Sequence, residues 1–125
     1  MNSLLVMIGG ALGALARYQF GRMAGHVFGM GWPWGTLGVN ILGGLFMGLL
    51  AGWLARHGTQ GGEQLRLLIG VGILGGFTTF SAFSLETALM IERGQYSGAA
   101  LYALLSVVLS VLALFGGLFT MRIAA

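Results

Sequence analysis

Four long apolar stretches, joined by short links, constrain most strongly what this chain can fold into. They cover about residues 3–27, 36–55, 65–91 and 97–121. The hydrocarbon core of a bilayer needs about 20 consecutive, mainly apolar residues in a helix, so each stretch is long enough to cross it. Only 7% of the 125 residues are charged, whereas soluble domains carry about 25%. The sequence therefore predicts an all-α integral membrane protein, one domain over residues 1–125, with four transmembrane helices.

The sequence argues against several classes of function. Cysteine and aspartate are absent, and no Ser/His/Asp set, phosphate-binding loop or pair of carboxylates is present, so the sequence does not predict an enzyme. No run of basic residues marks a nucleic-acid partner. The N-terminal stretch lacks a basic region followed by a small-residue cleavage site, so we expect it to remain as the first span.

The third stretch contains a segment that a simple lipid-crossing helix does not need. Residues 70–86 read GVGILGGFTTFSAFSLE, with two adjacent glycines, four hydroxyl residues and three phenylalanines. Backbone that leaves the regular helix at membrane depth must be buried in protein or line a wet cavity. The segment therefore predicts that the third helix is broken near its middle and that a polar pathway crosses the membrane there.

Phe80 and Phe83 are candidate pathway residues. They lie three residues apart and share a helix face, and the hydroxyl side chains of Thr79, Ser81 and Ser84 surround them. An aromatic ring is electropositive at its edge and negative on its face, so edge-on rings would favour a small anion and face-on rings a cation. The alternative for this pair is contact with lipid or with the protein core.

A helix broken at Gly75, Gly76, Thr78 and Thr79 would release backbone carbonyls from their helical partners. Carbonyls freed in this way are known ligands for cations such as sodium. The alternative is a glycine kink in which the hydroxyl groups bond back to their own chain. Composition does not separate the two interpretations.

Polar side chains also mark the second and fourth stretches. Asn40 is isolated in an apolar helix, where its amide can join two helices by hydrogen bonds or donate to a passing anion. Tyr102, Ser106 and Ser110 recur every four residues and so lie on one stripe of the fourth helix. Three hydroxyl groups on one stripe favour a wet track over isolated bonds to the helix backbone.

Arg17 and Glu86 are the two ionisable residues best placed to lie within the membrane. Such residues are functional candidates by default. Arg17 would concentrate anions in a vestibule, or its side chain would extend to the membrane surface. Glu86 would pair with an arginine or cap freed backbone donors.

The arginines that set membrane orientation are almost evenly divided between the two sides. Arg56, Arg66 and Arg122 belong to the side of the N-terminus, and Arg22 and Arg93 to the other. A chain balanced in this way can insert in both directions. We therefore expect an antiparallel, dual-topology homodimer, whose eight helices would resemble the inverted repeats of transporters.

Small residues and tryptophans support the same membrane architecture. Trp32, Trp34 and Trp53 fall near predicted span ends, as in an aromatic interface belt. Glycines four residues apart allow helix backbones to approach closely in lipid. These glycine sets are Gly9/Gly13, Gly21/Gly25, Gly44/Gly48/Gly52 and Gly72/Gly76, and packing within one chain or between subunits would explain them equally.

Three motifs resemble those of the small bacterial fluoride channels of the Fluc (CrcB) family. They are GGALGALARY at 9–18, GTLGVNILGGLFMG at 35–48 and GVGILGGFTTFSAFSLE at 70–86, and the resemblance covers essentially the whole chain. It implies a fluoride-selective ion channel that gives passive export of cytoplasmic fluoride. It also implies the bacterial cytoplasmic (inner) membrane and an antiparallel homodimer with two fluoride pathways.

The resemblance also implies roles for single residues. Phe80 and Phe83 match an aromatic box whose ring edges meet fluoride, and Gly75 and Thr78 match backbone-carbonyl ligands of a structural sodium ion at the dimer interface. Ala82 stands where the family more often has threonine, which removes a hydroxyl group beside the box. The other matches are Asn40, Tyr102, Ser106 and Ser110 along the pathway, Arg17 near the vestibule and Glu86 at the end of the motif.

Two other functions fit four spans. A small proton-coupled multidrug exporter would also be a dual-topology dimer, but it needs a glutamate open to both proton and drug, and the first stretch carries Arg17 instead. A non-transporting assembly subunit would use Phe80 and Phe83 only for packing. Ion flux that depends on these two rings separates the channel from both.

Overall fold

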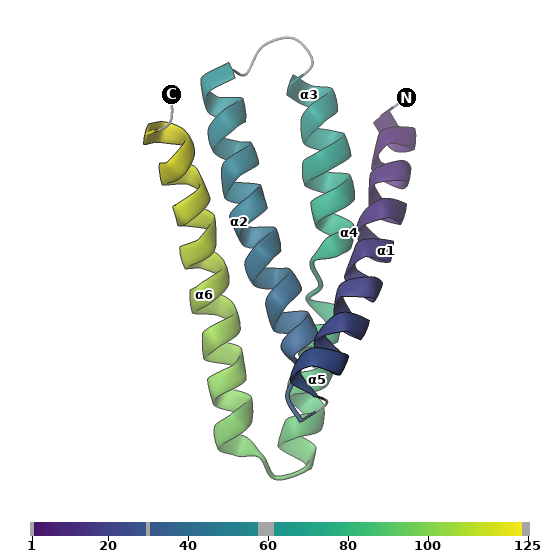
Figure 1. The fold of residues 1–125 in the computed structure, drawn as a ribbon, viewed down its shortest axis with the longest axis vertical. Coiled ribbons are helices and arrows are strands. Elements are labelled where there is room, and N and C mark those ends of the chain that lie inside the picture. The colour runs from purple at the N-terminus through teal and green to yellow at the C-terminus, as the bar shows by residue number, and fades with distance from the viewer. Residues whose placement is uncertain (1, 30, 58–61, 124–125) are drawn as a thin grey trace.

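The computed structural model describes residues 2–29, 31–57 and 62–123 of the chain, and all regular structure within them is helical. The elements are α1 (Asn2–Phe28), α2 (Trp34–His57), α3 (Gly62–Leu65), η1 (Arg66–Leu74), α4 (Gly75–Phe77), α5 (Ser81–Glu92) and α6 (Tyr96–Ile123). Figure 1 shows the long helical segments side by side, with both termini at one end. Four segments are long and apolar enough to cross a membrane: Asn2–Phe28, Trp34–Arg56, Gly62–Glu92 and Tyr96–Ile123. The predicted all-α fold with four spans is confirmed.

The third span is broken, as predicted, but the break does not fall at its glycines. Residues 66–74 form a π-helix, Gly75 and Gly76 continue as helix, and the regular structure stops at residues 78–80. Thr78 has an extended backbone with φ −83° and ψ 160°. Gly76 serves a different purpose, because a Cβ there would come within 2.6 Å of the Gly10 carbonyl oxygen. It allows close approach to α1, and the chain leaves the helix after Phe77.

Glycines bring the helix backbones together in pairs. A Cβ atom at Gly13 of α1 would overlap the carbonyl of Ile73 in η1, and one at Gly48 of α2 would overlap the carbonyl of Leu114 in α6. A Cβ at Gly117 of α6 would lie 2.6 Å from the Leu49 amide. In lipid, such packing replaces the hydrophobic drive. At these positions the glycine spacings serve packing within one chain.

A tight turn places α6 beside α5. Gly94 has φ +78°, a conformation that glycine adopts without steric cost, and α6 begins two residues later at Tyr96. The chain therefore folds straight back. This reversal brings Tyr102 of α6 next to Glu86 of α5.

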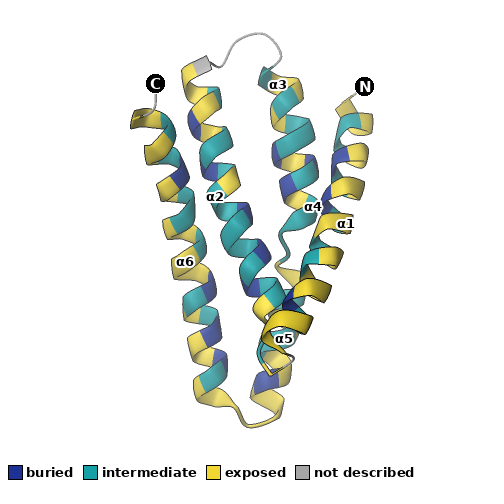
Figure 2. Ribbon diagram, viewed as in Figure 1, coloured by how far each residue is buried: buried dark blue, intermediate teal, exposed yellow. Residues whose placement is uncertain are grey.

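The core of the single chain is small. Tyr102 is its largest fully buried side chain, and the cluster around it contains Leu37, Met90 and Ala99. Figure 2 shows exposed residues along the outer sides of α1 and α6. Most of these are large apolar side chains, among them Met7, Leu12, Leu15, Leu104, Val107 and Leu112. A surface of this kind is suited to lipid and to protein contacts within a membrane.

A candidate ion pathway at the helix break

One side chain of the neighbouring helix α2 forms hydrogen bonds to the backbone at the break. Asn40 of α2 accepts a hydrogen bond from the Thr79 amide through Oδ1 (2.8 Å) and donates one through Nδ2 to the Thr79 carbonyl (3.0 Å). Both backbone groups of Thr79 thus bond to α2 and not to their own helix. The predicted bond between helices is confirmed, and it acts at the break itself.

The break leaves two particular carbonyls without their helical donors. In a continuous helix the amides of Thr79 and Ala82 would donate to the carbonyls of Gly75 and Thr78. Here the Thr79 amide bonds to Asn40, and the Ala82 amide bonds to the Thr79 hydroxyl oxygen at 3.1 Å. Gly75 and Thr78 are the residues that the family resemblance implies as sodium ligands.

The two threonine hydroxyls act in different ways. Thr78 Oγ1 bonds back to the Leu74 carbonyl (2.9 Å), as expected for a kinked helix. Thr79 Oγ1 instead caps α5, because it accepts the Ala82 amide. It also lies 3.3 Å from the hydroxyl of Ser81. The Thr78 hydroxyl thus follows the kinked-helix interpretation, whereas cation binding by the freed carbonyls stays a prediction.

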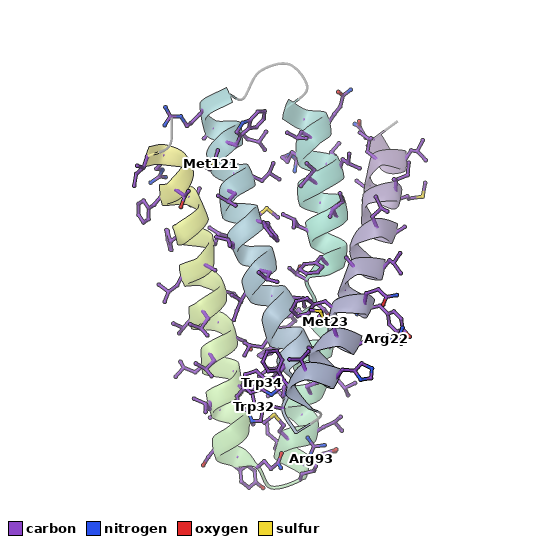
Figure 3. All side chains as sticks on the ribbon, in the orientation of Figure 1. Arg22, Met23, Trp32, Trp34, Arg93 and Met121 are labelled. Carbon is purple, nitrogen blue, oxygen red and sulfur yellow. The ribbon has the colours of Figure 1, made fainter. Side chains whose placement is uncertain are left out.

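A basic hollow lies beside the break. The Arg17 Nε donates to the Gly76 carbonyl (3.3 Å), and the Arg22 guanidinium lies 6.0 Å from the centre of the Tyr18 ring. Figure 3 shows Arg22 on the outer side of α1. The hollow has a volume of about 590 Å³, and its polar lining residues are Arg17, Tyr18, Arg22, His26, Thr36 and Thr79. Ala82 lines it too.

Most of the predicted pathway residues line one groove of about 400 Å³. They come from α2, from the break and from α6, and its walls are otherwise glycine and aliphatic side chains. No arginine or glutamate is among its lining residues. The predicted residues in this groove are Asn40, Gly75, Thr78, Thr79, Phe80, Phe83, Ser106 and Ser110.

The two serines of α6 have unused hydroxyl groups. Ser106 Oγ and Ser110 Oγ are buried and have no hydrogen-bond partner among the described residues. A serine or threonine in a membrane helix commonly bonds its own backbone, as Thr120 does with the Gly116 carbonyl at 2.7 Å. Two residues that line the groove therefore carry hydroxyl groups that their own helix does not use.

Aromatic rings continue from the groove into the core. The ring centres of Phe80 and Phe83 are 5.5 Å apart, and those of Phe83 and Tyr102 are 5.3 Å apart. The Tyr102 hydroxyl donates to Glu86 Oε1 at 2.9 Å. The carboxylate partner is thus a tyrosine, not the arginine or backbone amide expected from the sequence. Phe80 is 78% exposed in the single chain, so its ring is free on the side away from Phe83.

Ser81 and Ser84 are not brought into the groove. Both are exposed on α5, and neither is among the groove-lining residues. Sequence reasoning placed them with Phe80 because they are neighbours in the chain, whereas the helix turns them to other faces. Conversely, it assigned Trp32 only to an interface belt, although its ring centre lies 5.6 Å from that of Tyr102.

Comparison with known proteins gives consistent matches over the whole fold. The sequence model of the family described as CrcB-like protein, Camphor Resistance (CrcB), matches residues 4–118. A protein of Phenylobacterium zucineum (strain HLK1) is 61% identical over 119 residues, which are 95% of this chain and 94% of that protein. One of Caulobacter sp. (strain K31) is 59% identical over 95% and 93%, and one of Caulobacter vibrioides (strain NA1000 / CB15N) is 55% identical over 98% and 97%. All three are named "Fluoride-specific ion channel FluC".

Proposed function

The chain belongs to the CrcB family, and on this premise we propose that it is a fluoride-selective ion channel for passive export of cytoplasmic fluoride. It is a multi-pass protein of the bacterial inner membrane. The observation that carries the proposal is the groove beside the break, where Ser106 and Ser110, whose buried hydroxyls have no partner among the described residues, line the same space as Phe80 and Phe83. Hydroxyl groups and ring edges are donors for an anion.

The chemistry of the groove suits a small, strongly hydrated anion. An ion that enters must exchange water for protein donors, and the candidates are Ser106, Ser110 and the edges of the two phenylalanine rings. The side-chain amide of Asn40 already donates to the Thr79 carbonyl, so Asn40 stabilises the break as well as lining the groove. Arg17 lies in the basic hollow across the break, where it would raise the local anion concentration.

Acid–base chemistry explains why a passive fluoride channel would benefit the cell. Neutral hydrogen fluoride crosses lipid, ionises in a near-neutral cytoplasm and is retained there as fluoride. The membrane potential, negative inside, drives an anion outward through a passive path. No coupled energy source is needed, and none of the residues proposed for the groove has to change its protonation state.

We further propose that two antiparallel copies form the working channel and that a sodium ion joins them. The exposed Phe80 and the exposed Gly75 support a partner surface at the break. The carbonyls of Gly75 and Thr78 from each copy would supply four oxygen ligands, a donor set that suits sodium. Their diverted amide donors fit this set. Bound there, the ion would neutralise carbonyl dipoles that otherwise face one another.

The antiparallel arrangement predicts that orientation is mixed. Because the chain has no cysteine, a single one introduced at the exposed Gln95, in the turn before α6, reports which side that turn occupies. We expect a membrane-impermeant thiol reagent to label about half of the copies in sealed vesicles and the remainder after permeabilisation. Labelling of all or none before permeabilisation would contradict dual topology.

Removal of sodium tests the proposed structural ion. Replacing sodium by a large organic cation should lower the melting temperature of the purified dimer, and an unchanged melting temperature would contradict a structural role for sodium.

Ion efflux from liposomes tests the proposed function. With the purified protein and a potassium ionophore, we expect rapid release of fluoride and none of chloride, each read by its own electrode. Protein-free liposomes give the background. If the folded protein released neither fluoride nor chloride, the channel proposal would be contradicted. Drug uptake driven by a proton gradient and lost in Glu86→Gln would then favour the exporter.

A further inference from the structure

The Tyr102 ring packs against two other aromatic rings. Its centre lies 5.3 Å from that of Phe83 in α5, with the ring planes at 43°, and 5.6 Å from that of Trp32, with the planes at 82°. An edge-to-face pair is a preferred aromatic geometry. Tyr102 is completely buried, and Trp32 packs directly against the cluster that contains it. Three rings thus run from the link between α1 and α2 to the groove.

Trp32 also borders two hollows at this end of the molecule. One of about 330 Å³ includes Glu86, Met90 and Arg93 in its lining, and the other, of about 560 Å³, includes Leu101 and Leu105. Trp32 lines both, together with Gly31 and Trp34. Figure 3 shows it close to Trp34, beside α6. The indole is therefore part of the wall of both spaces and stands next to the Tyr102–Glu86 pair.

From this arrangement we infer that Trp32 is a positioning residue for conduction: it fixes the Tyr102 ring, and through it the ring plane of Phe83 in the groove. This inference rests on the proposed channel function. Phe83 is a groove residue whose own helix leaves it only partly buried, so its ring plane depends on what packs behind it. Without the indole, the Tyr102 ring loses its edge-to-face neighbour and gains room to turn, and Phe83 turns with it.

Replacement of the indole tests the inference by fluoride efflux. We expect Trp32→Leu to slow fluoride release between about twofold and about tenfold, the range that corresponds to one aromatic pair. Trp32→Phe keeps a ring and should lie between Trp32→Leu and the wild type. Trp34→Leu is the matched control, because Trp34 lies two residues after Trp32, at the start of α2, but its ring contacts are with Phe28 and Trp32 and not with Tyr102. It should stay within about twofold of the wild type.

The order of rates decides the outcome. A wild-type rate in Trp32→Leu, or an equal fall in Trp34→Leu, would overturn the inference, and so would a fall in Trp32→Phe as large as that in Trp32→Leu. Melting temperature and dimer mass are measured for each variant. If Trp32→Leu does not fold, Trp32→Phe is compared with Trp34→Phe: slower release only in the former supports the inference, and equal rates overturn it. If the wild-type protein released no fluoride, the proposed function itself would be contradicted.

Discussion

Replacing Phe80 by isoleucine is expected to slow fluoride efflux from liposomes at least about tenfold while leaving the protein folded. The ring is 78% exposed in the single chain, and its only ring contact among the described residues is with Phe83, so its loss removes little packing within the protomer. Isoleucine is of similar bulk but has no electropositive ring edge to offer an anion. A tenfold slower rate corresponds to about 1.4 kcal/mol of added barrier.

A second exposed phenylalanine provides the control for Phe80. Phe46 of α2 is 46% exposed and lies outside the groove, so Phe46→Ile should release fluoride at the wild-type rate. Equal rates for Phe80→Ile and wild type, with both proteins dimeric, would mean that this ring only packs. The assembly-subunit interpretation would then regain support.

Much of the fold followed from the sequence because lipid leaves few alternatives. Each apolar stretch had to satisfy its backbone hydrogen bonds internally, so four helices and short links were predictable from length and hydropathy. The expected spans of 3–27 and 97–121 differ from α1 (Asn2–Phe28) and α6 (Tyr96–Ile123) by only one or two residues at each end. The adjacent glycines and hydroxyl residues within 70–86 likewise predicted the broken span.

The local details of the break were not predictable, because they depend on which residues meet across the fold. Gly75 and Gly76 looked like the breaking residues, yet Gly76 faces the backbone of α1 and stays helical. The π-helical segment 66–74 before them has no marker in the sequence that we can identify. The partner of Glu86 depends on the α5–α6 turn, which brings Tyr102 within 2.9 Å. Such contacts are properties of the packed chain, not of its composition.

Asn40 is a residue whose importance the sequence predicted but whose bonding partners it did not. Its isolation in an apolar helix predicted a bond to another helix or to an anion, but not the atoms involved. The structure pairs its amide with both backbone groups of Thr79, so one side chain replaces two helical hydrogen bonds. This geometry gives Asn40 a structural role that can be separated experimentally from the role of the rings.

We expect Asn40→Ala to reduce both stability and fluoride efflux, in contrast to Phe80→Ile, which should reduce only efflux. Alanine leaves the Thr79 amide and carbonyl without partners in a partly buried site, and each unmade bond of this kind costs about 1–3 kcal/mol. The groove admits water to these groups, so we expect the lower end of that range and a clearly reduced melting temperature. Efflux should fall at least about tenfold, because the break no longer holds the groove residues in place.

The matched control for Asn40 is another polar side chain in a membrane helix. Within the part of the chain that the structure describes, the Thr120 hydroxyl of α6 bonds only the carbonyl of Gly116 in its own helix, so Thr120→Val should change neither the melting temperature nor the rate. If Asn40→Ala kept the wild-type melting temperature and lost conduction, Asn40 would act on the ion and not on the break. If it kept both, the extended backbone at Thr78 would have to be held by the chain itself, through the Thr79 cap on Ala82. The two measurements together therefore assign Asn40 to the ion, to the break or to neither.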